Sequence, residues 1–498
     1  MKRSTRRVLA VIPALLLQCA WLFILTRWLA PFAGLISFTL SVLSLIFVLY
    51  VATKLDESTY QILWLIVILA FPLPGTLLYL IVGNKRTTRP LRKRLQASSA
   101  AQEGSAWEYP SDMPLRVAES FDSVRKITGS VPCRNRGTVY YPLGEKMFEA
   151  MLADLRRARK FIFVEYFILE DGVMWDAMVE IMARKVEEGV DVRVMYDDVG
   201  SLSSWSPREA ASLRRRGIKC VPFNPLLFVS GTLNYRDHRK LLIIDGEAAF
   251  SGGVNLADEY INKKEKYGHW KDIGYRIAGE AVREHTKMFV EFWNAFSPEK
   301  IPAALVEPMP LPPEENHDGY VLSYYDSPLR AQAASNELYI DLLSQAERRA
   351  WFYTPYLLPG DALLSSFLRT ARRGVDVRII MPGIPDKKFI YRMSHSFYRP
   401  LLEAGVKIYE YAPGFVHAKG CVVDDVIGTV GTVNLDYRSL FLHFENNSLF
   451  YRASLLDDLR SDFEQTQALC REVRLEDLRS GFLNWLVDGF LRIIAPLC

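Results

Sequence analysis

The sequence predicts a membrane-anchored α/β protein in which two tandem α/β-sandwich domains form one shared active site. Three observations support this fold class: apolar segments near the N-terminus, apolar strands that alternate with longer amphipathic stretches farther along, and an internal repeat in that second part. With 498 residues the chain is also long enough for at least two units with sizeable cores.

The three apolar segments cover residues 8–30, 34–53 and 60–83, and Arg27 is the one charged residue among them. Each segment approaches the ~20 residues that a helix needs to cross the hydrocarbon of a bilayer. We therefore expect a membrane anchor over residues 1–94 with about three transmembrane helices.

Two details qualify this anchor. Pro72 and Pro74 fall inside the third segment, so we expect a kink or a short break there. The first segment follows the basic stretch "MKRSTRR" and has a secretory signal as its alternative interpretation. The length of its apolar stretch and the two segments behind it favour a helix that is retained.

The distribution of basic residues predicts the orientation of the anchor. With three spans, one side holds five basic residues (Lys2, Arg3, Arg6, Arg7 and Lys54) and the other holds seven (Arg27, Lys85, Arg86, Arg89, Arg92, Lys93 and Arg94). The excess favours the second side as cytoplasmic. We expect a multi-pass protein of the cell membrane with its catalytic domains on the cytoplasmic side.

Cysteine usage and net charge narrow the setting. The six cysteines form no CxxC or other ligand spacing, so a disulfide framework or a metal site is not expected, and free thiols suit a reducing compartment. The net charge of +4 is too small to indicate binding to nucleic acid.

Composition also places the domain boundaries. Residues 95–112 are small and polar, which predicts a linker, and four prolines within residues 307–319 predict a seam. The two domains would then cover residues 113–312 and 313–498. The end of the chain, residues 480–498, has apolar residues at helical spacing and predicts a core-packing helix, with contact to a membrane surface as the alternative.

The repeat consists of three pairs of segments in the same order. Segments in the first half recur 190, 185 and 179 residues later: "FVEYFI" as "YTPYLL", "EEGVDVRVM" as "RRGVDVRII", and "DHRKLLIIDGEAAFSGGVN" as "VHAKGCVVDDVIGTVGTVN". Loop-length differences can absorb this drift, so we interpret the second part of the chain as a duplication.

The last pair carries the residues that indicate chemistry. The first copy has His238, Lys240, Asp245 and Asn255; the second has His417, Lys419, Asp424 and Asn434 at identical intervals. Alternate residues of a strand share a face, so each histidine lies beside its lysine and each aspartate is on the other face. We therefore expect the histidines and lysines to form a site and the aspartates to brace it. The apolar runs "LLII" and "GCVV" between them read as buried strands of the parallel type.

Two such copies facing each other would place two imidazoles and two ammonium groups around one anionic centre, which fits a phosphodiester. One neutral imidazole can attack phosphorus, while the other, protonated, donates to the leaving alcohol oxygen. The lysines and the substrate-binding asparagines would hold the non-bridging oxygens through charge-assisted bonds, so neither a metal nor another cofactor is expected.

Each histidine should also have an orienting carboxylate that sets its protonation state. Glu445 is the candidate for the second copy. Asp272 is the candidate for the first copy, with Asp258 and Glu259 as competitors, and ordinary surface carboxylates are the alternative for all of them.

With HxKxxxxD followed by G[GST]xN twice, the chain resembles the phospholipase D superfamily and, within it, the bacterial cardiolipin synthase family. Further similar stretches include "YDDVGS", "MPGIPDKKFIYR" and "GTVNLDYRS", and the similarity runs from about residue 34 to the end. The first apolar segment is an additional span compared with two-span relatives.

The resemblance implies a reaction between two molecules of phosphatidylglycerol at an anionic membrane. One would form a phosphatidyl-histidine enzyme with loss of glycerol, and the other would accept the phosphatidyl group to give cardiolipin. In the superfamily the histidine of the first copy is usually the nucleophile, which implies His238 in that role and His417 as acid and base. The symmetry of the site leaves the reverse assignment open.

Other functions remain as alternatives. A different phosphatidyltransferase or a phospholipase D would share the chemistry and differ in the acceptor. A nuclease of the same superfamily has no need of transmembrane segments, and the mild charge balance disfavours it. An inactive lipid-binding scaffold would have no need of two intact sets of charged and titratable groups.

Overall fold

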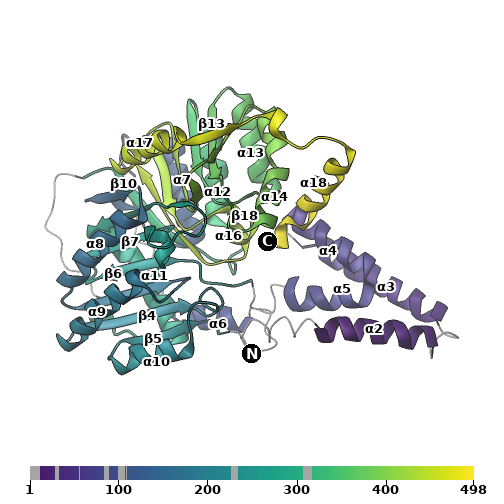
Figure 1. Ribbon diagram of the computed structural model, residues 1–498, viewed down its shortest axis with the longest axis horizontal. Coiled ribbons are helices and arrows are strands. Elements are labelled where there is room, and N and C mark those ends of the chain that lie inside the picture. The colour runs from purple at the N-terminus through teal and green to yellow at the C-terminus, as the bar shows by residue number, and fades with distance from the viewer. Residues whose placement is uncertain are drawn as a thin grey trace. The chain divides into compact units, whose positions relative to one another are not determined.

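The computed structural model describes residues 12–27, 33–54, 57–83, 89–98, 107, 109–225, 234–306 and 317–497. The chain divides into an N-terminal unit that ends at Pro90 and a larger unit that begins at Leu91 (Figure 1).

The N-terminal unit is helical. Its elements are α2 (Ile12–Arg27), α3 (Ala33–Ala52), α4 (Ser58–Ala70), α5 (Pro72–Leu78) and the π-helix η2 (Tyr79–Gly83). Among the described residues one helix, Gly34–Ala52, is both long and apolar enough to cross a membrane, with a mean hydropathy of 2.4. Helix α2 has 16 described residues, about 24 Å of helix, and residues 8–11 and 28–30 of the predicted first span lie outside the described residues.

The predicted third span, residues 60–83, does not form one transmembrane helix. Helix α4 ends at Ala70, the next residue, Phe71, has a non-helical φ of −134° and ψ of 75°, and α5 begins at Pro72. Two prolines in three residues remove backbone donors that a continuous helix needs. The predicted break is therefore present, and it reverses the direction of the chain.

Close contacts between the two arms show the reversal. A Cβ atom at Gly75 would lie 2.4 Å from the Val67 carbonyl oxygen, so only glycine lets α5 pack this closely on α4. The Tyr60 hydroxyl donates to the Gly83 carbonyl oxygen at 3.4 Å. The segment thus forms a helical hairpin whose first and last residues are neighbours.

The larger unit contains two sheets. The seven-stranded sheet has the order β2–β9–β7–β6–β3–β4–β5, with β2 (Thr138–Tyr141), β9 (Gly274–Ala278), β7 (Ala248–Gly252), β6 (Lys240–Ile244), β3 (Phe161–Tyr166), β4 (Asp191–Asp197) and β5 (Lys219–Phe223). The nine-stranded sheet has the order β1–β10–β19–β17–β16–β11–β13–β14–β20, with β1 (Cys133–Arg134), β10 (Tyr320–Asp326), β19 (Glu445–Tyr451), β17 (Ile427–Gly431), β16 (Gly420–Val423), β11 (Arg349–Tyr353), β13 (Asp376–Pro382), β14 (Lys407–Tyr411) and β20 (Cys470–Val473).

The strand orders confirm the duplication. Strands β9–β7–β6–β3–β4–β5 of the first sheet correspond one for one to β19–β17–β16–β11–β13–β14 of the second. The segments that match in sequence occupy the same places: β3 and β4 pair in parallel, as do β11 and β13.

The strands of the paired motif are buried, as expected, but they are not parallel. Strand β6 is antiparallel to both β3 and β7, and β16 is antiparallel to both β11 and β17. The apolar run has another cause. Leu241 and Ile243 point into the core between the two sheets, whereas Leu242 and Ile244 face the helices outside, so every position is buried.

Helices cover the outer faces of both sheets. The first sheet carries α8 (Gly144–Arg157), α9 (Val173–Glu187) and α10 (Pro207–Arg215); the second carries α7 (Leu115–Thr128), α12 (Ala334–Gln345), α13 (Asp361–Arg372), α14 (Lys388–Ser396) and α15 (Tyr398–Glu403) (Figure 1). Helices α11 (Val282–Phe296) and α17 (Leu455–Gln467) contribute to the core that both halves share.

Three segments bear on the predicted boundaries. Helix α6 (Arg89–Ser98) includes the start of the stretch expected to be a linker. Helix α7 and strand β1 precede the first sheet in sequence, yet β1 pairs with β10 and α7 packs in the core of the second sheet. Residues 307–316 of the expected seam lie outside the described residues.

Candidate active site

The histidines and lysines of the paired motif lie where strands enter the space between the halves. His238 comes two residues before β6, which begins at Lys240. His417 directly follows the short strand β15 (Gly414–Val416), and Lys419 precedes β16. All four residues are buried, with exposed fractions of at most 8%.

Backbone pairing joins each motif to the opposite half of the molecule. Strand β15 pairs in parallel with β8 (His269–Lys271), and the His417 amide donates to the Lys271 carbonyl oxygen at 2.7 Å. In the other direction, the His238 amide donates to the Phe444 carbonyl oxygen at 2.8 Å. The two halves therefore build one shared site, as the sequence predicts.

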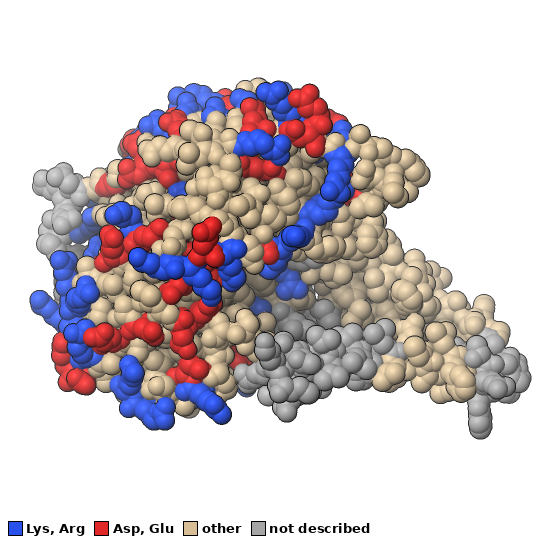
Figure 2. All heavy atoms as spheres, in the orientation of Figure 1, with Lys and Arg blue, Asp and Glu red and all other residues tan. Residues whose placement is uncertain are grey.

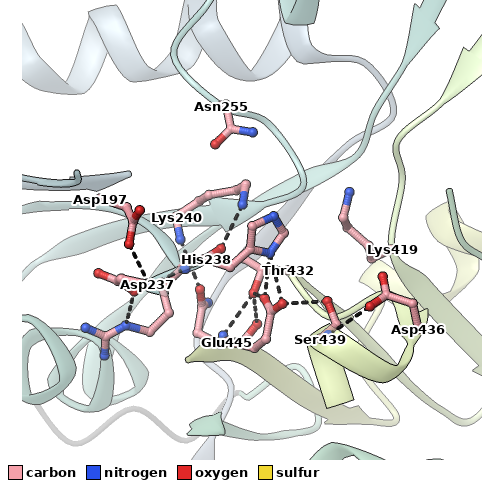
Figure 3. Close-up of polar contacts among 12 residues, drawn as sticks. Asp197, Asp237, His238, Lys240, Asn255, Lys419, Thr432, Asp436, Ser439 and Glu445 are labelled. Carbon is pink, nitrogen blue, oxygen red and sulfur yellow. Dashed lines mark hydrogen bonds and ion pairs between the residues drawn. The ribbon is translucent and has the colours of Figure 1, made fainter. Parts of the chain in front are cut away.

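The carboxylates that orient the histidines are Glu445 and Asp272, the two that the sequence indicates. Each of them binds the histidine of the opposite copy from the one expected. Glu445 lies 2.9 Å from His238 Nδ1 through both of its oxygens, and Asp272 Oδ2 lies 2.8 Å from His417 Nδ1. The expected assignment of Glu445 to the second copy and Asp272 to the first is therefore wrong. Figure 3 shows Glu445 beside His238.

The exchange follows from the backbone pairing. Asp272 comes directly after Lys271, whose carbonyl holds His417, and Glu445 comes directly after Phe444, whose carbonyl holds His238. The same short segment thus fixes the main chain of a histidine and supplies the carboxylate for its ring.

The two competing carboxylates have other partners. Asp258 accepts from the amides of Val173 and Met174 at the start of α9, and Glu259 pairs with Lys266 at 3.1 Å.

The residue that follows the first glycine of G[GST]xN is Gly253 in one copy and Thr432 in the other, and the surroundings of the two carboxylates differ for this reason. A Cβ atom at Gly253 would lie 2.0 Å from Asp272 Oδ1, so this position must be glycine for Asp272 to reach His417. The corresponding Thr432 instead donates its hydroxyl to Glu445 at 2.5 Å, and Ser439 donates to the same carboxylate at 2.6 Å. Sequence reasoning missed both hydroxyls, although Thr432 is the variable position of G[GST]xN.

The lysines are held by their own histidines. Lys240 Nζ donates to the His238 carbonyl oxygen at 2.7 Å, and Lys419 Nζ donates to the His417 carbonyl oxygen. Figure 3 shows the two ammonium groups on either side of the His238 ring. An ammonium has three N–H donors, so each keeps donors for a bound anion.

Burial favours the neutral form of each ionisable group in the site. Burial, followed by the Lys240 charge, lowers the pKa of His238 well below its usual value, and burial lowers the pKa of His417 to about 4 although Asp272 opposes it. Burial also lowers the pKa of Lys240 to about 8 and of Lys419 to about 7, and it raises the pKa of Glu445. An anion between these groups would favour the protonated, cationic forms of the histidines and lysines.

The motif aspartates lie at the far ends of their strands, outside this cluster. Asp245 accepts from three amides, those of Arg159, Lys160 and Phe161, at 2.7–2.9 Å, and Asp424 accepts from those of residues 347–349 at 2.7–2.9 Å. Both aspartates have positive φ values, 56° and 50°. Their carboxylates hold the start of the neighbouring central strand, which is the geometry of a brace.

The two motif asparagines have different surroundings. Asn255 accepts from the Ile168 amide at 3.2 Å and donates at 2.7 Å to the Tyr260 hydroxyl, whose ring lies edge-on to His417 at 5.2 Å. Asn434 has a buried side-chain oxygen without a hydrogen-bond partner among the described residues.

Two further features were not singled out from the sequence. The His443 ring lies 5.8 Å from the His238 ring, and its buried Nε2 has no partner among the described residues. Buried ion pairs flank His238 in sequence: Arg236 pairs with Asp197 at 2.9 Å, and Arg239 pairs with Asp237 at 3.0 Å. The mixed charges of "RDHRK", residues 236–240, are the sequence feature that could have indicated these ion pairs.

Comparisons with known proteins agree with this geometry. Residues 151–293 and 339–467 match a family model described as "Cardiolipin synthase, PLD-like domain", and residues 40–84 match one described as "Phospholipase_D-nuclease N-terminal". A Streptococcus mutans protein is 40% identical over 463 residues, covering 90% of this chain and 99% of its own.

Relatives with a descriptive name cover the chain equally well. A protein from Geobacillus sp. (strain WCH70) named cardiolipin synthase is 32% identical over 509 residues, covering 99% of this chain and 100% of its own. One of the same name from Halalkalibacterium halodurans is 32% identical over 456 residues, covering 89% of each chain. The crystal structure of a Haemophilus influenzae phosphatidylserine synthase has the same fold, with a TM-score of 0.57 at 16% identity over 76% of this chain and 98% of that one.

Proposed function

The chain belongs to the cardiolipin synthase family of phospholipase D-like proteins, and from that premise we propose that it transfers a phosphatidyl group between two phosphatidylglycerol molecules. The products are cardiolipin and glycerol. The observation that carries the proposal is the pair of histidines, each with its own carboxylate and lysine, enclosed between the two halves.

In the first step His238 Nε2 attacks the phosphorus atom of one phosphatidylglycerol. Its Nδ1 is held by Glu445, so Nε2 is the nitrogen left for the reaction. The P–N bond forms as the bond from phosphorus to the glycerol oxygen breaks. That oxygen takes a proton from His417, whose protonated form the bound phosphodiester and Asp272 favour.

In the second step the terminal hydroxyl of another phosphatidylglycerol attacks the phosphatidyl-histidine. His417 Nε2 takes the hydroxyl proton, the new P–O bond forms, and the P–N bond to His238 breaks. Both imidazoles return to their starting states, and cardiolipin leaves.

Two differences between the histidines favour His238 as the nucleophile. Burial is the largest cause that lowers the pKa of either ring, and lysine charges lower both further; His443 and His417 add to the fall for His238, whereas Asp272 partly offsets it for His417. The less basic imidazole stays neutral and can attack, and the more basic one carries the proton. Lys240 and Lys419 hold the non-bridging oxygens as charge develops on phosphorus, with Asn255 and Asn434 beside them.

The test uses purified full-length protein with phosphatidylglycerol labelled in its glycerol headgroup. Labelled glycerol released together with cardiolipin is the expected result. Phosphatidic acid as the sole lipid product would instead identify a phospholipase, and a product formed only when another alcohol is added would identify a different phosphatidyltransferase. Neither His238→Ala nor His417→Ala should retain activity.

The anchor has a specific proposed topology: α2 and α3 cross the membrane, and the hairpin of residues 60–83 enters and leaves on one side. This topology places Arg27 on one side of the membrane and all the other basic residues near the spans on the opposite side. Those residues are Lys2, Arg3, Arg6, Arg7, Lys54, Lys85, Arg86, Arg89, Arg92, Lys93 and Arg94. The positive-inside rule then gives one clear orientation, with the catalytic unit in the cytoplasm. Lys54 Nζ, 2.6 Å from the Tyr79 hydroxyl, lies beside the returning arm.

A further inference from the structure

The C-terminal helix α18 (Phe482–Ile494) has its apolar face on the outside. Phe482, Trp485 and Phe490 are 75%, 69% and 61% exposed, and Leu483 and Leu486 are exposed beside them. A surface helix normally buries this face against the core. The expected core-packing helix is therefore not what the structure shows, since of its residues only Leu491 is buried.

The polar residues of α18 instead hold it on the protein. Asp488 pairs with Arg392 of α14 at 2.5 Å, and the Arg492 guanidinium donates to the Ser396 carbonyl oxygen at 2.9 Å. These residues lie one helical turn apart, on the same face as Leu491. These contacts determine which face of α18 lies against the protein, and they therefore direct its apolar face outward.

The helix lies beside the active site. Its C-terminal end is held by Arg438, which donates to the Leu497 carbonyl oxygen at 3.2 Å. Arg438 belongs to α16 (Tyr437–Phe441), the helix whose Ser439 binds Glu445. The apolar surface of α18 is thus one short helix away from the carboxylate that orients His238.

Exposed basic and apolar residues continue this surface around α14. Phe389 is 54% exposed, and Lys387 and Lys388 lie next to it. Lys387 sits over the Tyr356 ring and acts electrostatically on His443 and Asp436 of the site. Figure 2 shows an uncharged lobe where Figure 1 labels α18, with Lys and Arg side chains beside it.

From these observations we infer that α18 lies in the headgroup region of an anionic phospholipid leaflet and docks the mouth of the active site on it. An aromatic and leucine face enters the boundary between headgroups and acyl chains, and adjacent lysines meet lipid phosphates. A substrate lipid can then present its phosphodiester to His238 while its acyl chains remain in the leaflet. The inference rests on the proposed function for the identity of that lipid.

The first experiment compares bilayer and monomeric substrate. Full-length Trp485→Glu and Phe490→Glu are assayed on phosphatidylglycerol vesicles and on dihexanoyl-phosphatidylglycerol below its micelle concentration, with Leu115→Glu of α7, 74% exposed, as the matched control. We expect the two α18 variants to lose roughly 10-fold or more on vesicles and to keep the wild-type rate on monomers. The control should match the wild type on both.

Two outcomes would overturn the inference: full activity of both α18 variants on vesicles, or equal losses on vesicles and monomers, which would mean that α18 acts on the fold of the site. A wild-type protein that makes no cardiolipin from either substrate would refute the proposed function instead.

A second experiment does not depend on the reaction. The chain has 10 tryptophans, so the difference in emission between wild type and Trp485→Phe, both reconstituted in vesicles, isolates Trp485. Lipids brominated near the headgroup should quench this difference signal strongly. A signal that they leave unquenched would show that α18 packs against protein or faces water.

Discussion

At the scale of single residues, the two motif histidines are chemically distinct although the duplication makes them equivalent in sequence. Thr432 and Ser439 hold the carboxylate of one pair, while the other carboxylate occupies the space left by Gly253. Lysine charges surround both rings in a buried site, so small differences in their partners separate their basicities.

A substrate with an activated leaving group should separate the two roles. A phosphatidyl ester of p-nitrophenol needs no proton at its leaving oxygen, so His417→Ala and Asp272→Asn should still release a burst of p-nitrophenol. His238→Ala and Glu445→Gln should not, because they impair attack on phosphorus; loss of an orienting carboxylate of this kind costs on the order of 10²–10⁴-fold. A burst from the second pair of variants and none from the first would reverse the assignment.

The pH dependence of kcat/KM should follow the lowered pKa values of the free protein. Activity should fall on the acid side as His238 becomes protonated, well below the usual range of an imidazole, because a protonated ring cannot attack phosphorus. It should fall on the alkaline side as Lys419 and Lys240 lose their charges, near pH 7 and 8. Lys419→Arg, which stays charged, should lose the lower alkaline step; an unchanged profile would exclude Lys419 as its origin.

At the scale of elements, each motif strand, β6 or β16, has its histidine and lysine at one end and its bracing aspartate at the other. Asp245 and Asp424 hold the starts of β3 and β11, which lie beside β6 and β16 in the sheets. Three amide donors on one carboxylate fix the position of one strand against the next. The aspartates thereby set the register of the strands that present each histidine and lysine.

Asp424→Asn should therefore lower the free energy of unfolding and have little effect on kcat. An amide nitrogen in place of one oxygen leaves backbone donors unpaired, which should cost about 2–4 kcal/mol of unfolding free energy, while asparagine still tolerates the positive φ of 50°. We expect a lower thermal midpoint and a kcat within about twofold of wild type per folded molecule. Asp425→Asn, its neighbour with a φ of 66°, is the control. Loss of kcat at unchanged stability would place Asp424 in the reaction.

At the scale of the whole molecule, the anchor and the catalytic unit illustrate two ways in which a chain folds back on itself. In the catalytic unit, each half completes the histidine–carboxylate pair of the other, so neither half has a complete site alone. In the anchor, two prolines and one glycine turn an apolar stretch into a hairpin.

Cysteine labelling can test the topology of the anchor. In a variant without native cysteines, single cysteines at Lys54 and Arg86 should both be protected from a membrane-impermeant maleimide in intact cells and both react after lysis. A cysteine at Ala33, the first residue of α3, should react in intact cells. Opposite accessibilities of positions 54 and 86 would show that residues 60–83 cross the membrane once.

Much of the site could be predicted because its signals are local. His238, Lys240, His417 and Lys419 were identifiable from their spacing, and the buried strands from their apolar runs. The partners of these residues come from distant segments: Asp272 lies 145 residues from His417, and Glu445 lies 207 residues from His238. No pattern within either copy indicates that these carboxylates are exchanged.

The order of residues along the chain thus specified the duplicated α/β architecture and predicted an N-terminal membrane association and the residue types of the site, because periodicity and motif spacing are properties of short segments. The folded structure alone decided which carboxylate serves which histidine, that the motif strands are antiparallel, that residues 60–83 turn back, and that α18 directs its apolar face outward. Each of these depends on contacts between segments far apart in the chain, and local sequence patterns do not specify such contacts.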